Sequence, residues 1–199
     1  MTTSHAVDAT SDTTLLARIG TGDAVALATV YRRHGAAVYR FACLHAGSQS
    51  FAADATQETF LWLARDGAVA FDPARNSLAA FLCGVARNHV LRIRTTEARY
   101  VGLPEHEEVV AIDDADARAA VDDALSHLLA RERGDALLQA LATLPAEQRE
   151  VIALVEFEEF SYVDAAAIIG CPIGTVRSRL SRAKVALKAR VLELFPAEQ

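Results

Sequence analysis

The sequence has few cysteines and no paired ones. Cys43, Cys83 and Cys171 are widely separated and form no Cys-x-x-Cys motif. Three thiols cannot all pair within one chain, and isolated cysteines are typical of small buried side chains in a reducing compartment. We therefore expect free thiols, no metal site and a cytoplasmic protein.

Long apolar runs are also missing. The longest uninterrupted ones, residues 24–28 and 165–169, are far shorter than the roughly 20 residues that span a bilayer. The first fourteen residues contain neither a basic segment nor an apolar one, so they do not resemble a secretory signal. Both absences predict that the protein does not insert into a membrane.

No segment alternates apolar and polar residues as a half-buried strand would. Apolar residues recur instead at intervals of three and four, over residues 26–46, 53–66, 78–99 and again from 135 onward. The fold class predicted is all-α. We expect a break near Gly35, a loop over residues 67–77, and Ser77 as the N-terminal cap of the helix that follows.

Charge divides the chain into unequal parts, although the net charge is -6. Residues 100–134 hold three basic and nine acidic residues, whereas residues 177–190 hold six basic residues and no acid. We interpret residues 1–10 as a disordered N-terminus, 11–99 and 135–199 as two helical domains, and 100–134 as an acidic flexible linker. Because physiological salt screens charges beyond about 8 Å, the basic cluster can attract a polyanion despite the acidic total.

The C-terminal domain contains the pattern of a helix-turn-helix. Ser161 and Asp164 form a capping-box-like start for a short helix that runs through Ile169. The Gly-Cys-Pro sequence at 170–172 predicts a turn, with Pro172 at the first position of a longer helix.

The longer helix has one apolar stripe and one basic face. The expected buried stripe has gaps of three and four: Ile173, Val176, Leu180, Ala183, Leu187 and Val191. Removing it leaves a different face that carries Arg177, Ser178, Ser181, Arg182 and Val185. Arginine and serine suit contacts with base edges and phosphates in a major groove, which is wide enough for a helix. An ordinary amphipathic helix with a solvated basic face is the alternative.

Residues 144–188 resemble the fourth domain of bacterial RNA polymerase sigma factors of the sigma-70 family, extracytoplasmic-function (ECF) group. That pattern runs Leu-Pro, Gln-Arg-Glu, an apolar helix, Ser-Tyr, and then Gly-x-Pro-x-Gly-Thr-Val-Arg-Ser-Arg-Leu-x-Arg-Ala. The sequence supplies it as "LPAEQRE", "SY" and "GCPIGTVRSRLSRA".

The N-terminal half resembles the second domain of the same family. "YRRHGAAVYRFA" at 31–42 is similar to its first helix, and "DATQETFLWL" at 54–63 to the segment that docks on the polymerase clamp. "FDPARNSLAAFLCGVARNHV" at 71–90 is similar to the reader of the promoter -10 element. The two motifs occur in the family's order, on either side of a linker.

The resemblance implies a function and a set of site residues. The chain would be no enzyme and would need no cofactor and no small-molecule substrate. It would bind RNA polymerase core through the clamp of the beta-prime subunit and the beta flap, read promoter DNA, and bind an anti-sigma factor. The implied core-binding residues are Asp54, Gln57 and Glu58. The implied -10 residues are Phe71, Asn76, Arg87, Asn88 and Arg92. The implied -35 residues are Thr175, Arg177, Ser178, Arg179, Ser181, Arg182 and Lys184.

Other interpretations stay open at this point. A dimeric helix-turn-helix regulator that acts without core polymerase would share the C-terminal motif, as would an interaction module with a vestigial one. The polar face of Asp54, Gln57 and Glu58 would also suit simple solvation, and Asn88 would suit a local helix hydrogen bond. Trp62 is expected in the core rather than as a wedge that melts DNA.

Overall fold

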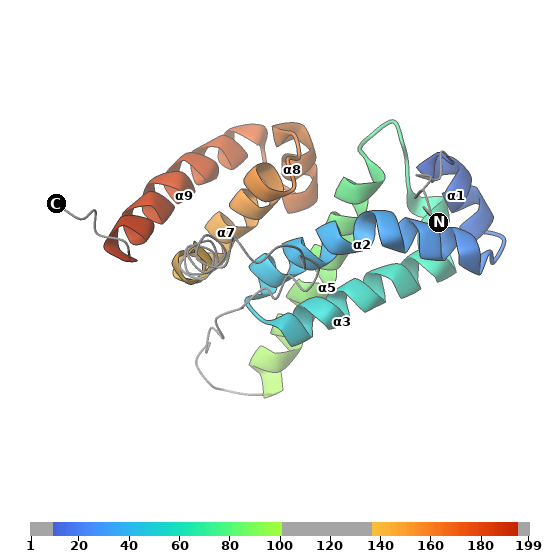
Figure 1. Ribbon diagram of the computed structural model, residues 1–199, viewed down its shortest axis with the longest axis horizontal. Coiled ribbons are helices and arrows are strands. Elements are labelled where there is room, and N and C mark those ends of the chain that lie inside the picture. Colours follow the sequence, from blue (N-terminus) through green and yellow to red (C-terminus); the bar gives the residue numbers. More distant parts are fainter. Residues whose placement is uncertain (1–9, 101–136, 195–199) are drawn as a thin grey trace, which may run out of the picture.

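The computed structural model describes residues 10–100 and 137–194. These two ranges contain helices, turns and loops but no strand, which confirms the expected all-α fold (Figure 1). The expected N-terminal segment 1–10 and acidic linker 100–134 lie almost entirely outside the described residues. No helix of the described ranges is long and apolar enough to cross a membrane. The described residues also contain no group of three side chains that could hold a metal ion.

The N-terminal domain is built on three long helices. Its elements are α1 (Asp12–Ile19), α2 (Ala24–Ala46), α3 (Gln49–Trp62), a π-helical turn η1 (Leu63–Gly67), α4 (Ala68–Ala70) and α5 (Leu78–Tyr100). Helices α2, α3 and α5 pack against one another, and α1 packs on α2 (Figure 1). Their shared core includes the fully buried side chains of Val30, Phe41, Leu63 and Leu82.

Local side-chain bonds determine where these helices begin. The Asp23 carboxylate accepts the backbone N–H groups of Val25 and Ala26 at 2.9 and 3.1 Å, which caps α2. Ser77 accepts the N–H of Ala80 at 3.2 Å, so the expected cap of α5 is confirmed. At the other end of α2, Gly47 takes the left-handed conformation with φ of 69°.

The C-terminal domain follows the expected helix-turn-helix order. Residues 137–142 are helical, and they precede α7 (Ala146–Ile152), a π-helical turn η3 (Ala153–Phe157), α8 (Tyr162–Ile169) and α9 (Ile173–Leu194). Helix α9 packs against both α7 and α8. Val151, Ile152, Leu154 and Val176 are buried where these elements meet.

The two domains pack against each other. Helix α8 lies against α5, while α7 and η3 lie against α2, so that Figure 1 shows the blue and green helices beside the orange ones. One cluster of buried apolar side chains runs through both domains. Arg149 joins them as well, because its Nε donates to the carbonyl of Leu44 at 3.2 Å while Nη1 donates to those of Ala142 and Leu144 at 3.0 and 2.9 Å.

Two expectations for the N-terminal domain are wrong. Gly35 does not break α2, which continues through it; Gly35 is buried in mid-helix with the ring of Tyr31 beside it. A single glycine costs a helix only about 1 kcal/mol, and the packing of α2 against α1, α3 and α5 exceeds that cost. The loop expected over 67–77 is shorter, because Gly67 still belongs to η1 and residues 68–70 form α4.

Two details of α9 also differ from expectation. Pro172 is not the first helical residue: its carbonyl accepts from Thr175 and Val176, which makes it the cap before Ile173. Ile173 was expected in the buried stripe but is 39% exposed. It occupies the first position of α9, directly after the turn from α8. Val176, Leu180 and Ala183 are buried as expected, whereas Leu187 and Val191, also expected in the stripe, are only partly buried.

Candidate nucleic-acid interfaces

The position of α9 is set by the turn before it. The Ser161 hydroxyl accepts the N–H of Asp164 at 3.1 Å and donates to its carboxylate at 2.7 Å, which fixes the start of α8. Gly170 ends α8 in the left-handed conformation, with φ of 76°. A Cβ at Gly170 would meet no atom within 4 Å, so glycine is needed here for its backbone freedom and not for space.

The basic face of α9 is open to solvent. Arg177, Ser178, Ser181 and Arg182 are all exposed, and Val185 on the same face has 70% of its surface accessible. The buried stripe of Val176, Leu180 and Ala183 holds the opposite side of the helix in the domain core. The separation of faces that the sequence predicts is therefore present.

Side chains on this face bond locally. Ser178 Oγ donates to the carbonyl of Thr175 at 3.0 Å, and Arg182 Nε donates to the carbonyl of Ser178 at 3.2 Å. The Arg177 guanidinium lies 5.6 Å from the ring centre of Tyr162 on α8. These bonds turn the arginines along the surface of α8 and α9, where an exposed pair of this kind is readily exchanged for a ligand.

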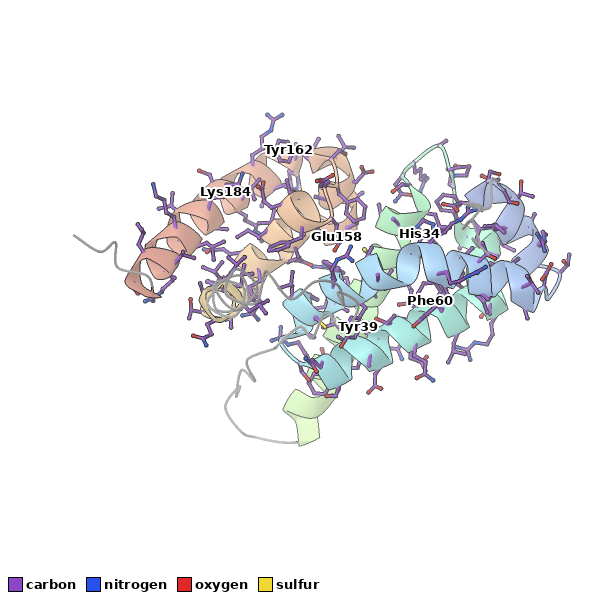
Figure 2. All side chains as sticks on the ribbon, viewed as in Figure 1. His34, Tyr39, Phe60, Glu158, Tyr162 and Lys184 are labelled. Atoms are coloured by element: carbon purple, nitrogen blue, oxygen red, sulfur yellow. The ribbon has the colours of Figure 1, made fainter. Side chains whose placement is uncertain are left out.

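Two flanking cations are paired with acids of the same domain. Arg179 Nη2 lies 2.9 Å from Glu147 of α7, and Lys184 Nζ lies 2.8 Å from Glu156 of η3. Figure 2 shows Lys184 and Tyr162 on the same upper part of the domain. The sequence motif did not reveal these acidic partners, because they lie 28 or more positions from their cations.

A second face extends from the loop before α5 along that helix. Asn76 is half-buried before the helix, while Asn88 and Arg92 are exposed along it. In the loop between α4 and α5, Asp72 accepts the N–H of Ala74 at 3.0 Å and pairs with Arg75. These bonds give the loop a defined shape.

An aromatic cluster packs against this loop. The ring of Phe71 lies 5.4 Å from that of Phe81, and Phe81 lies 5.9 Å from Trp62. Gly67 is required beside Trp62, since a Cβ there would lie only 2.5 Å from the indole ring. Phe71 and Trp62 are both half-buried, so Phe71 keeps only part of its ring for stacking and Trp62 packs within the domain.

Arg87 is not on the open part of this face. Its Nε donates to the carboxylate of Glu150, which belongs to α7 of the other domain and has a side chain only 3% exposed. Burial raises the pKa of Glu150, and the bond from Arg87 opposes that rise. Nothing in the local sequence around Arg87 indicates this partner 63 positions away.

His45 lies beside this ion pair. Its Nδ1 is 3.8 Å from Glu150, too far for a hydrogen bond, and neither ring nitrogen has a hydrogen-bond partner. Burial, together with the charges of Arg87, Arg94 and Arg149, lowers the pKa of His45 to about 3. The imidazole is therefore neutral at pH 7 and stacks on Phe41 with ring centres 5.7 Å apart.

The candidate core-binding residues lie on a third surface. Asp54, Gln57 and Glu58 are all exposed on α3. Gln57 also lines a groove of about 430 Å³ between α2 and α3, together with the aromatic side chains of Tyr31, Tyr39 and Phe60. Figure 2 shows Tyr39 and Phe60 along these two helices.

Family models match both halves of the chain. The model described as Sigma-70 region 2 matches residues 30–100, and the one described as Sigma-70, region 4 matches residues 134–187. The matches occur in the order that the sequence motifs predict.

Curated relatives extend the similarity over nearly the whole length. The chain is 32% identical over 192 residues to the ECF RNA polymerase sigma factor SigC of Mycobacterium tuberculosis, covering 94% of this chain and 95% of that one. It is 33% identical over 184 residues to the sigma factor SigM of the same species, covering 92% and 85%.

Solved structures share the fold. The sigma factor RpoE of Bartonella quintana, crystallised with the anti-sigma factor NepR, aligns with a TM-score of 0.62 and 31% identity, over 85% of this chain and 96% of that one. The structure of CnrH in complex with the cytosolic domain of CnrY aligns with a TM-score of 0.62 at 23% identity, over 94% and 99%.

Proposed function

Because this chain belongs to the ECF group of the sigma-70 family, whose members direct promoter-specific transcription initiation with RNA polymerase, we propose that α9 reads the -35 element and that α5 with its preceding loop reads the -10 element. The chain is thus a sigma factor and not an enzyme. The observation that carries the residue assignment is the exposed basic face of α9, which belongs to a helix-turn-helix in the part of the chain that the region 4 model matches.

At the -35 element, α9 enters the major groove of duplex DNA. Arg177, Ser178, Ser181 and Arg182 face the bases, each good base contact contributing about 1–3 kcal/mol of discrimination. Thr175, Arg179 and Lys184 contact the flanking phosphates. The pairing of Arg179 and Lys184 with acids that are themselves exposed supports their role, and Thr175 is half-buried in the first turn of α9.

At the -10 element, the loop before α5 holds a base of the non-template strand that has left the stack. Asn76 and Asn88 supply hydrogen bonds to it, Phe71 supplies part of a stacking surface, and Arg87 and Arg92 contact phosphate. The bonded loop and the aromatic cluster beneath it support a pocket of fixed shape. This role requires Arg87 to leave Glu150.

RNA polymerase core binds the N-terminal domain through its beta-prime clamp, at Asp54, Gln57 and Glu58. Their exposure beside the apolar groove of α2 and α3 supports a docking surface with an apolar centre and a polar rim. The C-terminal domain contacts the beta flap. In this assignment residues 11–99 and 135–199 are the two functional domains, and the linker 100–134 joins them across the promoter.

The protein acts in the cytoplasm, where its polymerase and promoter are, and an anti-sigma factor holds it inactive. The family resemblance and the crystal complex of the similar RpoE with NepR support that partner. A dimeric helix-turn-helix regulator, the alternative raised by the C-terminal motif alone, would have no need of the region 2 match at residues 30–100.

The test is run-off transcription with purified core polymerase and fragmented genomic DNA. We expect defined transcripts that require both the core and this protein. If no promoter-specific transcript appears although the protein binds core, the proposed reading of promoter elements is wrong.

A further inference from the structure

Two arginines of the N-terminal domain meet two buried carboxylates of the C-terminal domain. Arg87 of α5 donates to Glu150 of α7. Arg40 of α2 donates to Glu158 through both Nε and Nη2, each at 2.9 Å. The side chains of Glu150 and Glu158 are 3% and 4% exposed, and Figure 2 shows Glu158 where the two domains meet. Both pairs are therefore contacts between domains, although the Arg40 side chain itself stays 46% exposed.

The two arginines lie along the same seam of the N-terminal domain. Helices α2 and α5 pack side by side. The charges of Arg40 and Glu158 both act on the thiol of Cys83, which lies one helical turn before Arg87 on α5. The seam thus presents two guanidinium groups toward the C-terminal domain.

The geometry at Arg40 is that of phosphate recognition. A guanidinium that donates two parallel N–H bonds binds the two oxygens of a carboxylate and of a phosphate in the same way. Glu158 is held in this fork with two bonds of equal length. A nucleic-acid phosphate would suit the same fork once the carboxylate has left it.

The arrangement of the domains cannot serve both promoter elements at once. Helix α8, which carries α9 toward the -35 element, packs directly against α5, the reader of the -10 element. A spacer of about 17 base pairs separates such elements by roughly 58 Å. The domains must therefore come apart on the promoter, and that motion removes Glu150 and Glu158 from the two arginines.

We propose that Arg40 and Arg87 form one binding site for backbone phosphates of promoter DNA, and that Glu150 and Glu158 occupy this site in the free protein. This inference rests on the proposed function and adds Arg40 to the DNA-binding residues. It also assigns a role to the two carboxylates, which keep the site filled until the domains separate. Free protein should accordingly bind DNA more weakly than protein whose domains have separated.

The test compares full-length variants by the fluorescence anisotropy of a labelled 20-nucleotide single-stranded DNA. The double variant Glu150→Gln/Glu158→Gln removes both negative charges at nearly constant shape. We expect it to bind about tenfold more tightly than the wild type. Two additional phosphate contacts should steepen the dependence of log affinity on log salt by about 1.4.

Arg40→Gln in that background should remove most of the gain. Arg18→Gln is its control, because Arg18 loses the same charge on α1, where it pairs only with Asp23 in the described contacts. Asp66→Asn/Glu159→Gln is the control for the carboxylates: both side chains are exposed, and the change in net charge is the same. Equal gains in the two double variants would show a general charge effect and overturn the site.

Separation of the domains is measured by small-angle X-ray scattering on the same samples. Glu158→Arg serves as a second variant, because the new positive charge would face the guanidinium of Arg40. The repulsion between the two should push the domains apart. A larger radius of gyration without tighter DNA binding overturns the proposal, as does tighter binding that Arg40→Gln leaves intact. An unchanged radius and affinity in both variants also overturn it, since the carboxylates then neither close the protein nor block DNA.

Run-off transcription separates this inference from the proposed function. If Arg40→Gln supports a wild-type yield of promoter-specific transcript at elevated salt, the phosphate site is wrong while the sigma activity stands. If no variant initiates at any promoter, the proposed promoter reading fails, and the anisotropy series still decides whether the carboxylates mask Arg40.

Discussion

The two faces proposed to read DNA differ in what holds their arginines. On α9, Arg177 and Arg182 are exposed, and their contacts among the described residues are with their own domain. On the N-terminal seam, Arg40 and Arg87 are bound by carboxylates of the other domain that are almost completely buried. A bond to a buried carboxylate is harder to exchange for a ligand than one whose two partners are both exposed, even though the Arg40 side chain itself is 46% exposed. The difference indicates that the -35 face is ready for DNA in the free protein, whereas part of the -10 face becomes available only after the domains separate.

The largest effect should come from weakening the contact between the two domains at Arg149. We call the seam of Arg40 and Arg87 the covered face, and the exposed side of α9 with Arg177 and Arg182 the open face. In Arg149→Met the carbonyls of Leu44, Ala142 and Leu144 lose a buried charged donor. We expect a loss of about 3 kcal/mol or more in the free energy of unfolding, measured by urea denaturation, because each buried acceptor left without a donor costs about 1–3 kcal/mol. The same change at the exposed Arg18, which pairs with Asp23, should cost less than about 1 kcal/mol. Similar losses for both would mean that Arg149 does not anchor the domain interface.

The open face is tested by Arg182→Ala. Loss of one base contact should lower transcription from a cognate promoter by about tenfold or more, for about 1–3 kcal/mol. Binding to core polymerase should not change, because Arg182 is remote from α3. The matched control is Arg190→Ala, which removes the same charge from an exposed position near the end of α9, where Arg190 pairs with Glu193. An equal yield of run-off transcript from Arg182→Ala and wild type would rule out its role in reading the -35 element.

The sequence predicts a face well when the contacts that form it join residues close together in the chain. The stripe of Val176, Leu180 and Ala183 was predicted because a helix repeats every 3.6 residues, so the spacing alone determines which side is buried. The caps at Ser77 and Ser161 were predicted for the same reason, since each bonds an N–H group three residues away. Whether individual residues of either face contact DNA stays a prediction.

The covered face could not be predicted in this way. Arg87 and Glu150 are 63 positions apart, and Arg40 and Glu158 are 118 apart. No periodicity relates residues on opposite sides of a linker, and each residue taken alone is typical of a solvated helix. Gly35 shows the opposite error: a strong local signal for a break was overridden by the packing of α2 in the core.

Acid should lower the free energy of unfolding through His45, which lies beside the Arg87–Glu150 pair. At pH 7 His45 is neutral in the folded and unfolded chain. As the pH falls below about 6.5, the unfolded chain takes up a proton that the folded chain, with a His45 pKa of about 3, does not. Stability is therefore lost between about pH 6.5 and 3.

The raised pKa of Glu150 acts in the opposite direction, because the folded chain then binds a proton more readily than the unfolded one as the pH falls.

The variant His45→Phe isolates the contribution of the histidine. It keeps the stacking on Phe41 and removes two ring nitrogens that lack partners. Between pH 7 and 5 it should lose about 1–2 kcal/mol less of unfolding free energy than the wild type. A second variant, His45→Gln, should show the same flatter profile; parallel profiles for all three proteins would exclude His45 as the source.

The smallest effect on stability should come from the turn at Gly170, which joins α8 to α9. Gly170→Ala should cost about 1 kcal/mol, because alanine must adopt φ of 76° in the turn although its Cβ meets no atom within 4 Å. Gly174→Ala is the matched change: Gly174 lies in the first turn of α9, also has open space around it, and has no positive φ. There alanine should stabilise by up to about 0.5–1 kcal/mol, since it favours helix over the unfolded chain. Thermal denaturation of both variants measures the difference. If both changes shift the stability in the same direction, the left-handed conformation at Gly170 is not what requires glycine there.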